Sequence, residues 1–289
     1  MQPIREELTL KKISFNNIVE KVAEMAIASN RYLPPDVTEA LKKSQVHETS
    51  ELGREILADL LLNQEIAARE KLPLCQDTGM AVVFVELGQD VHIEGGLLED
   101  AINQGIAKGY SEGYLRKSML NDPLLRQNTN DNTPAILHIK LVAGSNLKIT
   151  LAPKGGGAEN MSAVAMLKPS AGRQGVKDFV LQTVKKAGAN PCPPLVVGIG
   201  IGGNLEKSAL LAKTALLRPL NQAHHQSELA QLEQEILTEI NNMNIGPLGF
   251  GGTTGALAVA IETYPCHIAC LPVAVNLNCH VARHHSVVL

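Results

Sequence analysis

Residues 71–79 of this chain read KLPLCQDTG, and at this stretch the sequence changes from a helical to a strand-like pattern. Before it, leucine and isoleucine recur every three or four positions between residues 52 and 61, which predicts the buried face of an amphipathic helix. After it, residues 80–87 are rich in valine and end at a glycine turn, which predicts a β-strand. Cys75, Gln76 and Asp77 are therefore expected on a loop between a helix and a strand.

The same periodicities divide the rest of the chain into elements. Strand-like runs at 136–142 and 147–151, joined by turn residues 144–146, predict a β-hairpin. A strand is also predicted at 195–201, and apolar runs occupy 256–261 and 268–275. Helices are predicted at residues 16–29, 36–43, 97–109, 162–167, 174–187, 205–217 and 228–240. Because helices and strands do not alternate regularly, we expect an α+β fold with antiparallel or mixed sheets flanked by helices, in a single domain over residues 1–289.

The composition argues against nucleic-acid-binding and membrane proteins. The chain has 26 basic and 29 acidic residues, a net charge of −3 and no basic run, whereas nucleic-acid binding needs a basic surface. No apolar run approaches the roughly 18 residues that a membrane helix needs. Residues 1–12 lack the apolar core of a secretory signal, and the five cysteines are widely spaced, so we expect a cytoplasmic protein.

The cysteines are the first candidates for chemistry. No pair has the C-x-x-C spacing of structural zinc, and the simplest interpretation is that all five are small buried residues. Three of them have unusual neighbours. Cys75 precedes Gln76 and Asp77, Cys192 stands among three prolines, and Cys279 lies between an asparagine and a histidine. These three are candidate metal ligands, and three thiolates can leave one metal of a cluster open to substrate.

Two glycine-rich stretches could bind phosphate or carboxylate groups. Residues 198–203, GIGIGG, match the G-x-G-x-x-G pattern of a dinucleotide loop, but the expected second strand and its acidic residue do not follow. Close packing of a helix on a strand explains these glycines more simply. Gly155, Gly156 and Gly157 follow Lys154 ahead of a predicted helix, where exposed amides could bind a carboxylate, although a flexible turn has the same pattern.

Other polar residues are weaker candidates. A carboxylate ligand would need a cationic partner, and Arg116 is the candidate for that role, although a single arginine is more often a surface residue. His267, twelve residues before Cys279, could act as an acid or a base. Histidines at 280, 284 and 285 have a spacing that could bind a metal, but a polar tail explains them better.

The chain contains five further motifs, which are LCQDTG at 74–79, GYLRKS at 113–118, NTNDNTP at 128–134, KGGGAENMS at 154–162 and NPCPP at 190–194. Together they resemble the class I iron–sulfur hydro-lyases over nearly the whole chain. The resemblance favours the α chain of two-subunit fumarate hydratase over that of L-tartrate dehydratase, because the tartrate enzymes look less similar around Arg116 and through residues 128–134.

This resemblance implies a 4Fe-4S cluster held on loops by Cys75, Cys192 and Cys279, with one iron acting as a Lewis acid on the hydroxyl of the substrate. It also implies a separate β subunit, an α2β2 assembly and the interconversion of fumarate and (S)-malate, a reaction of the tricarboxylic acid cycle. The remaining roles follow from the same resemblance. The substrate carboxylates would be bound by Gln76, Arg116, Gly155, Gly156 and Gly157, and the proton at the hydroxyl would be handled by Asp77 and His267.

Two other interpretations remain open. Cys266 and Cys270 depart from the family pattern, and one of them could be a fourth thiolate that closes the cluster for electron transfer. For Cys270, a place in the core is the simpler expectation. A metal-free module that binds small carboxylates through the triple-glycine stretch is the third possibility.

Overall fold

The computed structural model describes residues 10–289, which divide into two compact units. The first unit contains the described residues up to Tyr32, then Cys75–Lys154 and Arg283–Leu289; the second contains Leu33–Leu74 and Gly155–Ala282. The expectation that residues 1–12 form no secretory signal falls mostly on residues 1–9, outside the described part. Within the described part, no helix is both long enough and apolar enough to cross a membrane.

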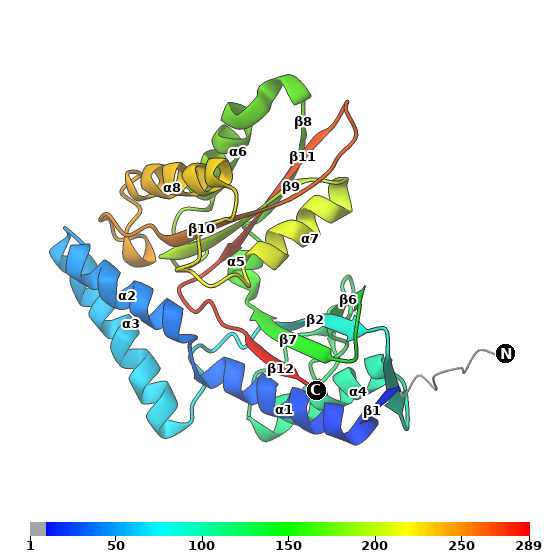
Figure 1. Cartoon of the computed structure of the whole chain (residues 1–289). Helices are drawn as coiled ribbons and strands as arrows, with labels where there is room; N and C mark the ends of the chain where they lie inside the picture. The colour runs from blue at the N-terminus through cyan, green and yellow to red at the C-terminus, as the bar shows by residue number, and fades with distance from the viewer. Residues whose placement is uncertain (1–9) are drawn as a thin grey trace. The chain divides into compact units, whose positions relative to one another are not determined.

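A four-stranded mixed sheet is the centre of the first unit (Figure 1). β2 pairs antiparallel with β7 and parallel with β6, and β7 pairs antiparallel with β12. Alternate residues of β2 and β7 form one apolar face, and α1 and α4 pack against it. The order across the sheet is β12 (His285–Val288), β7 (Leu147–Lys154), β2 (Met80–Gly88) and β6 (Ile136–Val142).

Shorter elements complete the first unit. The side chain of Ser14 accepts a hydrogen bond from the backbone N–H of Asn17 and so caps the first turn of α1. The helices are α1 (Phe15–Arg31) and α4 (Leu98–Glu112). The small strand pairs are β1 (Lys11–Ser14) with β3 (Val91–Glu94), and β4 (Leu120–Asp122) with β5 (Gln127–Asn128).

The second unit contains another four-stranded mixed sheet (Figure 1). β9 and β10 are parallel, whereas β11 is antiparallel to both β9 and β8. Apolar residues of α6 and α8 pack on one face, and α7 packs on the other. The order is β10 (Ala256–Tyr264), β9 (Leu195–Gly202), β11 (Leu271–Asn278) and β8 (Ala163–Leu167). The helices are α2 (Pro35–His47), α3 (Glu51–Glu70), α5 (Gly156–Glu159), α6 (Gly172–Ala187), α7 (Leu205–Ala215) and α8 (Ser227–Asn241), with 3-10 turns at Pro169–Ala171 and Pro247–Gly249.

The predicted α+β class is confirmed, with mixed sheets and flanking helices, but two local predictions are wrong. Residues 162–167 do not form a helix, because Ala163–Leu167 pairs with β11 and alternates its exposure along the strand. Residues 144–146 do not close a hairpin, because β2 lies between β6 and β7 in the sheet. Strand β11 also starts only at Leu271, so Cys266 and Cys270 lie in a turn before it. The number of domains stays a prediction.

The G-x-G-x-x-G stretch serves the contact between β9 and α7. A Cβ atom on Gly200 would overlap the carbonyl oxygen of Ser208 in α7, and one on Gly198 would overlap that of Ala212. Because only glycine has no Cβ, these two positions let the helix backbone approach the strand closely. The packing interpretation of this motif is therefore supported by the structure.

A buried carboxylate joins the start of α3 to a distant loop in the second unit. Glu48 is 2% exposed and accepts hydrogen bonds from the backbone N–H groups of Ser50 (2.9 Å), Thr253 (2.9 Å) and Thr254 (2.8 Å). Burial alone would raise the pKa of Glu48, but these hydrogen bonds outweigh it and lower the pKa from 4.5 to about 2. The ionised form therefore stabilises the fold.

We expect Glu48→Gln to lower the free energy of unfolding at pH 7 by on the order of 2–3 kcal/mol, because the amide cannot accept all these hydrogen bonds. The folded-state pKa lies below the unfolded-state value, so this stabilisation is complete above about pH 4.5 and is lost as the pH falls toward 2. Urea unfolding at several pH values should show the difference between the two proteins shrinking in acid. Glu39→Gln, which removes an exposed ion pair with Lys43, is the matched control and should leave the stability nearly unchanged at every pH. A difference that is constant from pH 7 to pH 3 would contradict this account.

Candidate functional site

Two of the predicted cluster ligands lie on neighbouring loops of the second unit. Cys192 lies between α6 and β9, and Cys279 directly follows β11. His280 joins these loops, because its backbone N–H donates to the carbonyl oxygen of Cys192 at 3.3 Å and its Nδ1 lies 3.0 Å from the same oxygen. Cys192 is exposed, and Cys279 is partly exposed. The structure therefore brings these two ligand candidates together within one unit.

The Cys192 loop has a constrained backbone. Cys192 has φ of 54°, in the left-handed region that residues with a Cβ rarely adopt. Its N–H donates to the carbonyl of Ala189 at 3.0 Å, and the carbonyl of Pro193 accepts from the N–H of Leu248 at 2.8 Å. Unfavourable backbone conformations that the surrounding structure enforces are common at functional sites. The direction of the Cys192 side chain is thus set by its loop.

The third ligand candidate, Cys75, lies in the first unit at the start of the loop that leads into β2. The Cys75 thiol donates to Oε1 of Gln76, with the sulfur 3.2 Å away, and Cys75 is partly exposed. Oδ1 of Asp77 accepts from the N–H of Gly79 at 2.9 Å, which closes a tight turn. Gly79 has φ of 74°, and a Cβ there would lie 2.8 Å from backbone atoms of Lys154. The turn therefore requires glycine at this position.

Buried side chains hold the Cys75 loop in place. The hydroxyl of Tyr110, on α4, donates to the carbonyl of Thr78 at 2.7 Å and lies 3.0 Å from that of Gly79. Nδ2 of Asn132 donates to the carbonyl of Gly79 at 3.2 Å. Nη2 of Arg283, a residue only 4% exposed, donates to the carbonyl of Asp77 at 2.7 Å. These contacts satisfy loop carbonyls that would otherwise be buried without a donor.

The same loop is connected to the segment that carries Arg116. The hydroxyl of Thr78 donates to the backbone carbonyl of Arg116 at 2.9 Å, while Oδ1 of Asn132 accepts from the N–H of Ser118 at 2.7 Å. Burial raises the pKa of Tyr110 to about 12, so its hydroxyl keeps its proton and remains a donor at neutral pH. Gln76, Asp77 and the Arg116 backbone therefore belong to one hydrogen-bonded assembly in the first unit.

Four residues of this assembly were not predicted from the sequence: Thr78, Tyr110, Asn132 and Arg283. Asn132 belongs to the NTNDNTP motif, and Arg283 follows Cys279 by four residues, so each lay close to a motif. Tyr110 had no such signal, because its contact joins residues 32 positions apart.

The triple-glycine stretch begins α5 in the second unit and is connected to β11. Glu159, at the end of α5, accepts from Nζ of Lys213 at 2.6 Å and from Nδ2 of Asn276 at 2.9 Å. Asn276 also donates to the hydroxyl of Ser162 at 3.1 Å. Asn276 lies three residues before Cys279 on the chain, so the glycine segment and the strand leading to that cysteine are held together.

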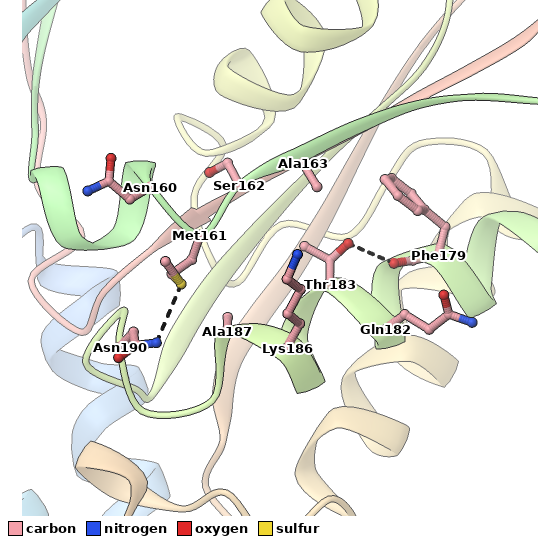
Figure 2. Close-up of a pocket in the computed structure, with 10 residues that line it drawn as sticks. All are labelled: Asn160, Met161, Ser162, Ala163, Phe179, Gln182, Thr183, Lys186, Ala187 and Asn190. Carbon is pink, nitrogen blue, oxygen red and sulfur yellow. Dashed lines mark hydrogen bonds between the residues drawn. The ribbon is translucent and has the colours of Figure 1, made fainter.

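A pocket of about 420 Å³ lies beside the Cys192 loop (Figure 2). Its polar lining includes Asn160, Ser162, Lys186 and Asn190, two residues before Cys192. Nδ2 of Asn190 lies 3.6 Å from the sulfur of Met161, and Figure 2 shows this contact at one end of the pocket. A cavity of this size can hold a small polar molecule.

The other predicted site residues are accessible. Gln76 and Arg116 are exposed in the first unit. His267 is exposed in the turn before β11, where its carbonyl accepts from the N–H of Cys270 at 2.9 Å and its Nδ1 accepts from that of Ala269 at 3.1 Å. Gly155, Gly156 and Gly157 are partly or fully accessible. Among residues 10–289, no three histidine, cysteine, aspartate or glutamate side chains gather as a site for a metal ion.

Comparison with known proteins covers nearly the whole chain. Residues 19–288 match the family model described as fumarate hydratase (Fumerase). A putative L(+)-tartrate dehydratase subunit alpha of Methanocaldococcus jannaschii is 41% identical over 272 residues, which cover 92% of this chain and 94% of that protein. The L(+)-tartrate dehydratase subunit alpha of Escherichia coli O157:H7 is 29% identical over 282 residues, covering 96% and 93%. The chain thus belongs to the fumarate hydratase (Fumerase) family, as the α subunit of a class I hydro-lyase.

Proposed function

We propose that this α subunit, together with a β subunit in an α2β2 assembly, binds a 4Fe-4S cluster through Cys75, Cys192 and Cys279 and dehydrates a small hydroxy-dicarboxylate. The main support is the contact of His280 with the Cys192 carbonyl, because it places two of the three thiols on adjoining loops. A β subunit is proposed because the relatives are named as alpha subunits. We propose a cytoplasmic location, since accessible thiols and an iron–sulfur cluster suit a reducing compartment.

The donor set fits such a cluster. Thiolates are the usual ligands of iron–sulfur clusters, and all three cysteines are at least partly accessible. Their loops are also constrained, by the left-handed backbone of Cys192 and by the hydrogen bonds below Cys75. When bound by three thiolates, a four-iron cluster supplies one iron as a Lewis acid for the hydroxyl of the substrate.

The chain's own residues would then bind the substrate and move one proton. A charge-assisted hydrogen bond contributes about 1.5–3 kcal/mol, whereas a helix dipole contributes about 0.3–1 kcal/mol. Arg116 should therefore contribute more to carboxylate binding than the backbone amides of Gly155, Gly156 and Gly157. Gln76 would orient the substrate through its amide. Asp77 and His267 would exchange the proton at the hydroxyl oxygen, and the base for the carbon-bound proton would belong to the β subunit.

Two substrates are supported by different observations. The names of the relatives favour L(+)-tartrate, which we place first. The resemblance at Arg116 and through residues 128–134 favours fumarate and (S)-malate, and a place in the tricarboxylic acid cycle would follow only from that substrate pair. Both substrates are four-carbon dicarboxylates, so the same carboxylate-binding groups could hold either of them.

The substrate is tested by coexpressing the chain with its β subunit, reconstituting the cluster without oxygen and measuring kcat/KM for each acid. We expect turnover of L(+)-tartrate above that of its stereoisomers. Faster hydration of fumarate would select the second substrate, whereas an active cluster enzyme that turned over none of these acids would contradict the proposed reaction.

The ligand set is tested with Cys75→Ser, Cys192→Ser and Cys279→Ser. Each variant should lose the visible absorbance of the cluster and most of its iron, because a thiolate is replaced by a poor iron ligand. Cys266→Ser and Cys270→Ser are matched controls that should keep the iron. Loss of iron in either control would support the closed, electron-transfer cluster instead, and a wild-type protein without iron after reconstitution would support the metal-free module.

The role of Asp77 is tested with Asp77→Asn in the reconstituted complex. The amide oxygen can still accept the hydrogen bond from Gly79, so the loop and the iron content should be preserved. The rate should fall about 10²–10⁴-fold, because the amide cannot exchange a proton at the hydroxyl. Full activity with normal iron content would show that another group performs this proton transfer.

A further inference from the structure

Strand β6 leaves an apolar edge on the sheet of the first unit. It is the last strand of that sheet, and within residues 10–289 no strand pairs with its outer side. Ile139 is 53% exposed and Leu141 is 65% exposed. A long, accessible and apolar edge strand offers backbone groups and side chains to another strand.

The apolar side chains of β6 lie on one face. Leu137, Ile139 and Leu141 pair in register with Val83, Val85 and Leu87 of β2, whose side chains face the apolar core of this unit. Side chains alternate along a strand, so Lys140 lies on the opposite face. Its charge therefore does not interrupt the apolar row.

The sequence of β6, ILHIKLV, is nearly symmetric about Ile139. If a second copy pairs antiparallel with this residue at the centre, Ile139 lies opposite Ile139, and Leu137 lies opposite Leu141. On the other face, Ile136 lies opposite Val142, and His138 opposite Lys140. Every pair is then apolar except that of His138 with Lys140.

We propose that two copies of this chain associate through β6, in antiparallel register centred on Ile139, so that their four-stranded sheets join into one sheet of eight strands. A twofold axis makes each contact occur twice. Such an axis therefore requires a strand that is complementary to itself. The β subunit is a different chain and would gain nothing from the symmetry of this sequence. The proposal concerns assembly and does not depend on the substrate or on the cluster.

The register is tested by cross-linking the coexpressed α–β complex under mild oxidation. Residues directly opposite in an antiparallel pair have Cα atoms about 4.5–5.5 Å apart, within the range of a disulfide. Ile139→Cys should therefore give a covalent α–α dimer, with the 139–139 link identified by peptide mass spectrometry. In Leu137→Cys, the two new cysteines would be about 13 Å apart along the paired strands, and no 137–137 link should form. Absence of the 139–139 link, or an equal yield of the 137–137 link, overturns the proposal.

The interface is tested by measuring the mass of the same complex by light scattering. Ile139→Lys should weaken the α–α contact by at least about a hundredfold and halve the mass, because two charges would face each other at the axis. Leu124→Lys, which adds the same charge at an exposed leucine outside β6 in the first unit, should leave the mass unchanged. Unchanged mass in Ile139→Lys overturns the proposal, as does selective loss of the β subunit, which would assign the edge to that chain. If circular dichroism shows that Ile139→Lys does not fold, the cross-linking result of the cysteine variants decides whether the proposal holds.

Discussion

The geometry of the candidate site depends on hydrogen bonds from buried side chains to the carbonyl groups of loops. Tyr110 is the clearest case, because its hydroxyl reaches the carbonyls of both Thr78 and Gly79. A buried carbonyl without a donor costs about 1–3 kcal/mol, so the loop is held in the one conformation that satisfies it. Burial also keeps the tyrosine protonated, with a pKa of about 12. The donor is therefore insensitive to pH across the physiological range.

The second unit uses the same principle with other residues. The carbonyl of Cys192 is held by His280, and the acidic group of Glu159 is held by Lys213 and Asn276. The Cys192 segment is a loop and α5 is a single helical turn, so neither belongs to a long regular element that could by itself fix a thiol or an amide in space. Side-chain contacts from neighbouring elements supply that rigidity, and rigid support is what a metal ligand or a substrate-binding group requires.

Local patterns in the sequence predicted those features that depend on neighbouring residues. The helix before residue 71 and strand β2 after it have clear periodicity, and the unusual neighbours of Cys75, Cys192 and Cys279 singled out those cysteines. Residues 162–167 are predicted as a helix because a short segment with two alanines shows no decisive period, and pairing with β11 makes Ala163–Leu167 strand β8 instead. The turn at 144–146 predicts a hairpin because nothing near it reveals that β2, some 50 residues earlier, lies between the two strands.

Long-range contacts explain why the rest of the site could not be predicted. Arg283 and Asp77 are 206 residues apart in the chain, and Asn132 is 53 residues from Gly79. No local spacing encodes such contacts. The GIGIGG stretch shows the complementary problem, because the same glycines suit a nucleotide loop and a close helix–strand contact. What decided between them was the position of Gly200 beneath Ser208, which only the packing of α7 reveals.

The four edges of the two four-stranded sheets differ in how well they are protected against association. β12 has only four residues, and α2 packs beside β10. β8 has five residues and an alanine at its centre, whereas β6 has seven, with Ile139 at its centre. Buried apolar area contributes about 25 cal/mol per Å², so a row built on isoleucine and leucine gains more from pairing than one built on alanine. Natural edge strands commonly carry a charge that prevents pairing, and in β6 the only lysine lies on the face away from the apolar row. The lysine therefore leaves the apolar row of this edge uninterrupted.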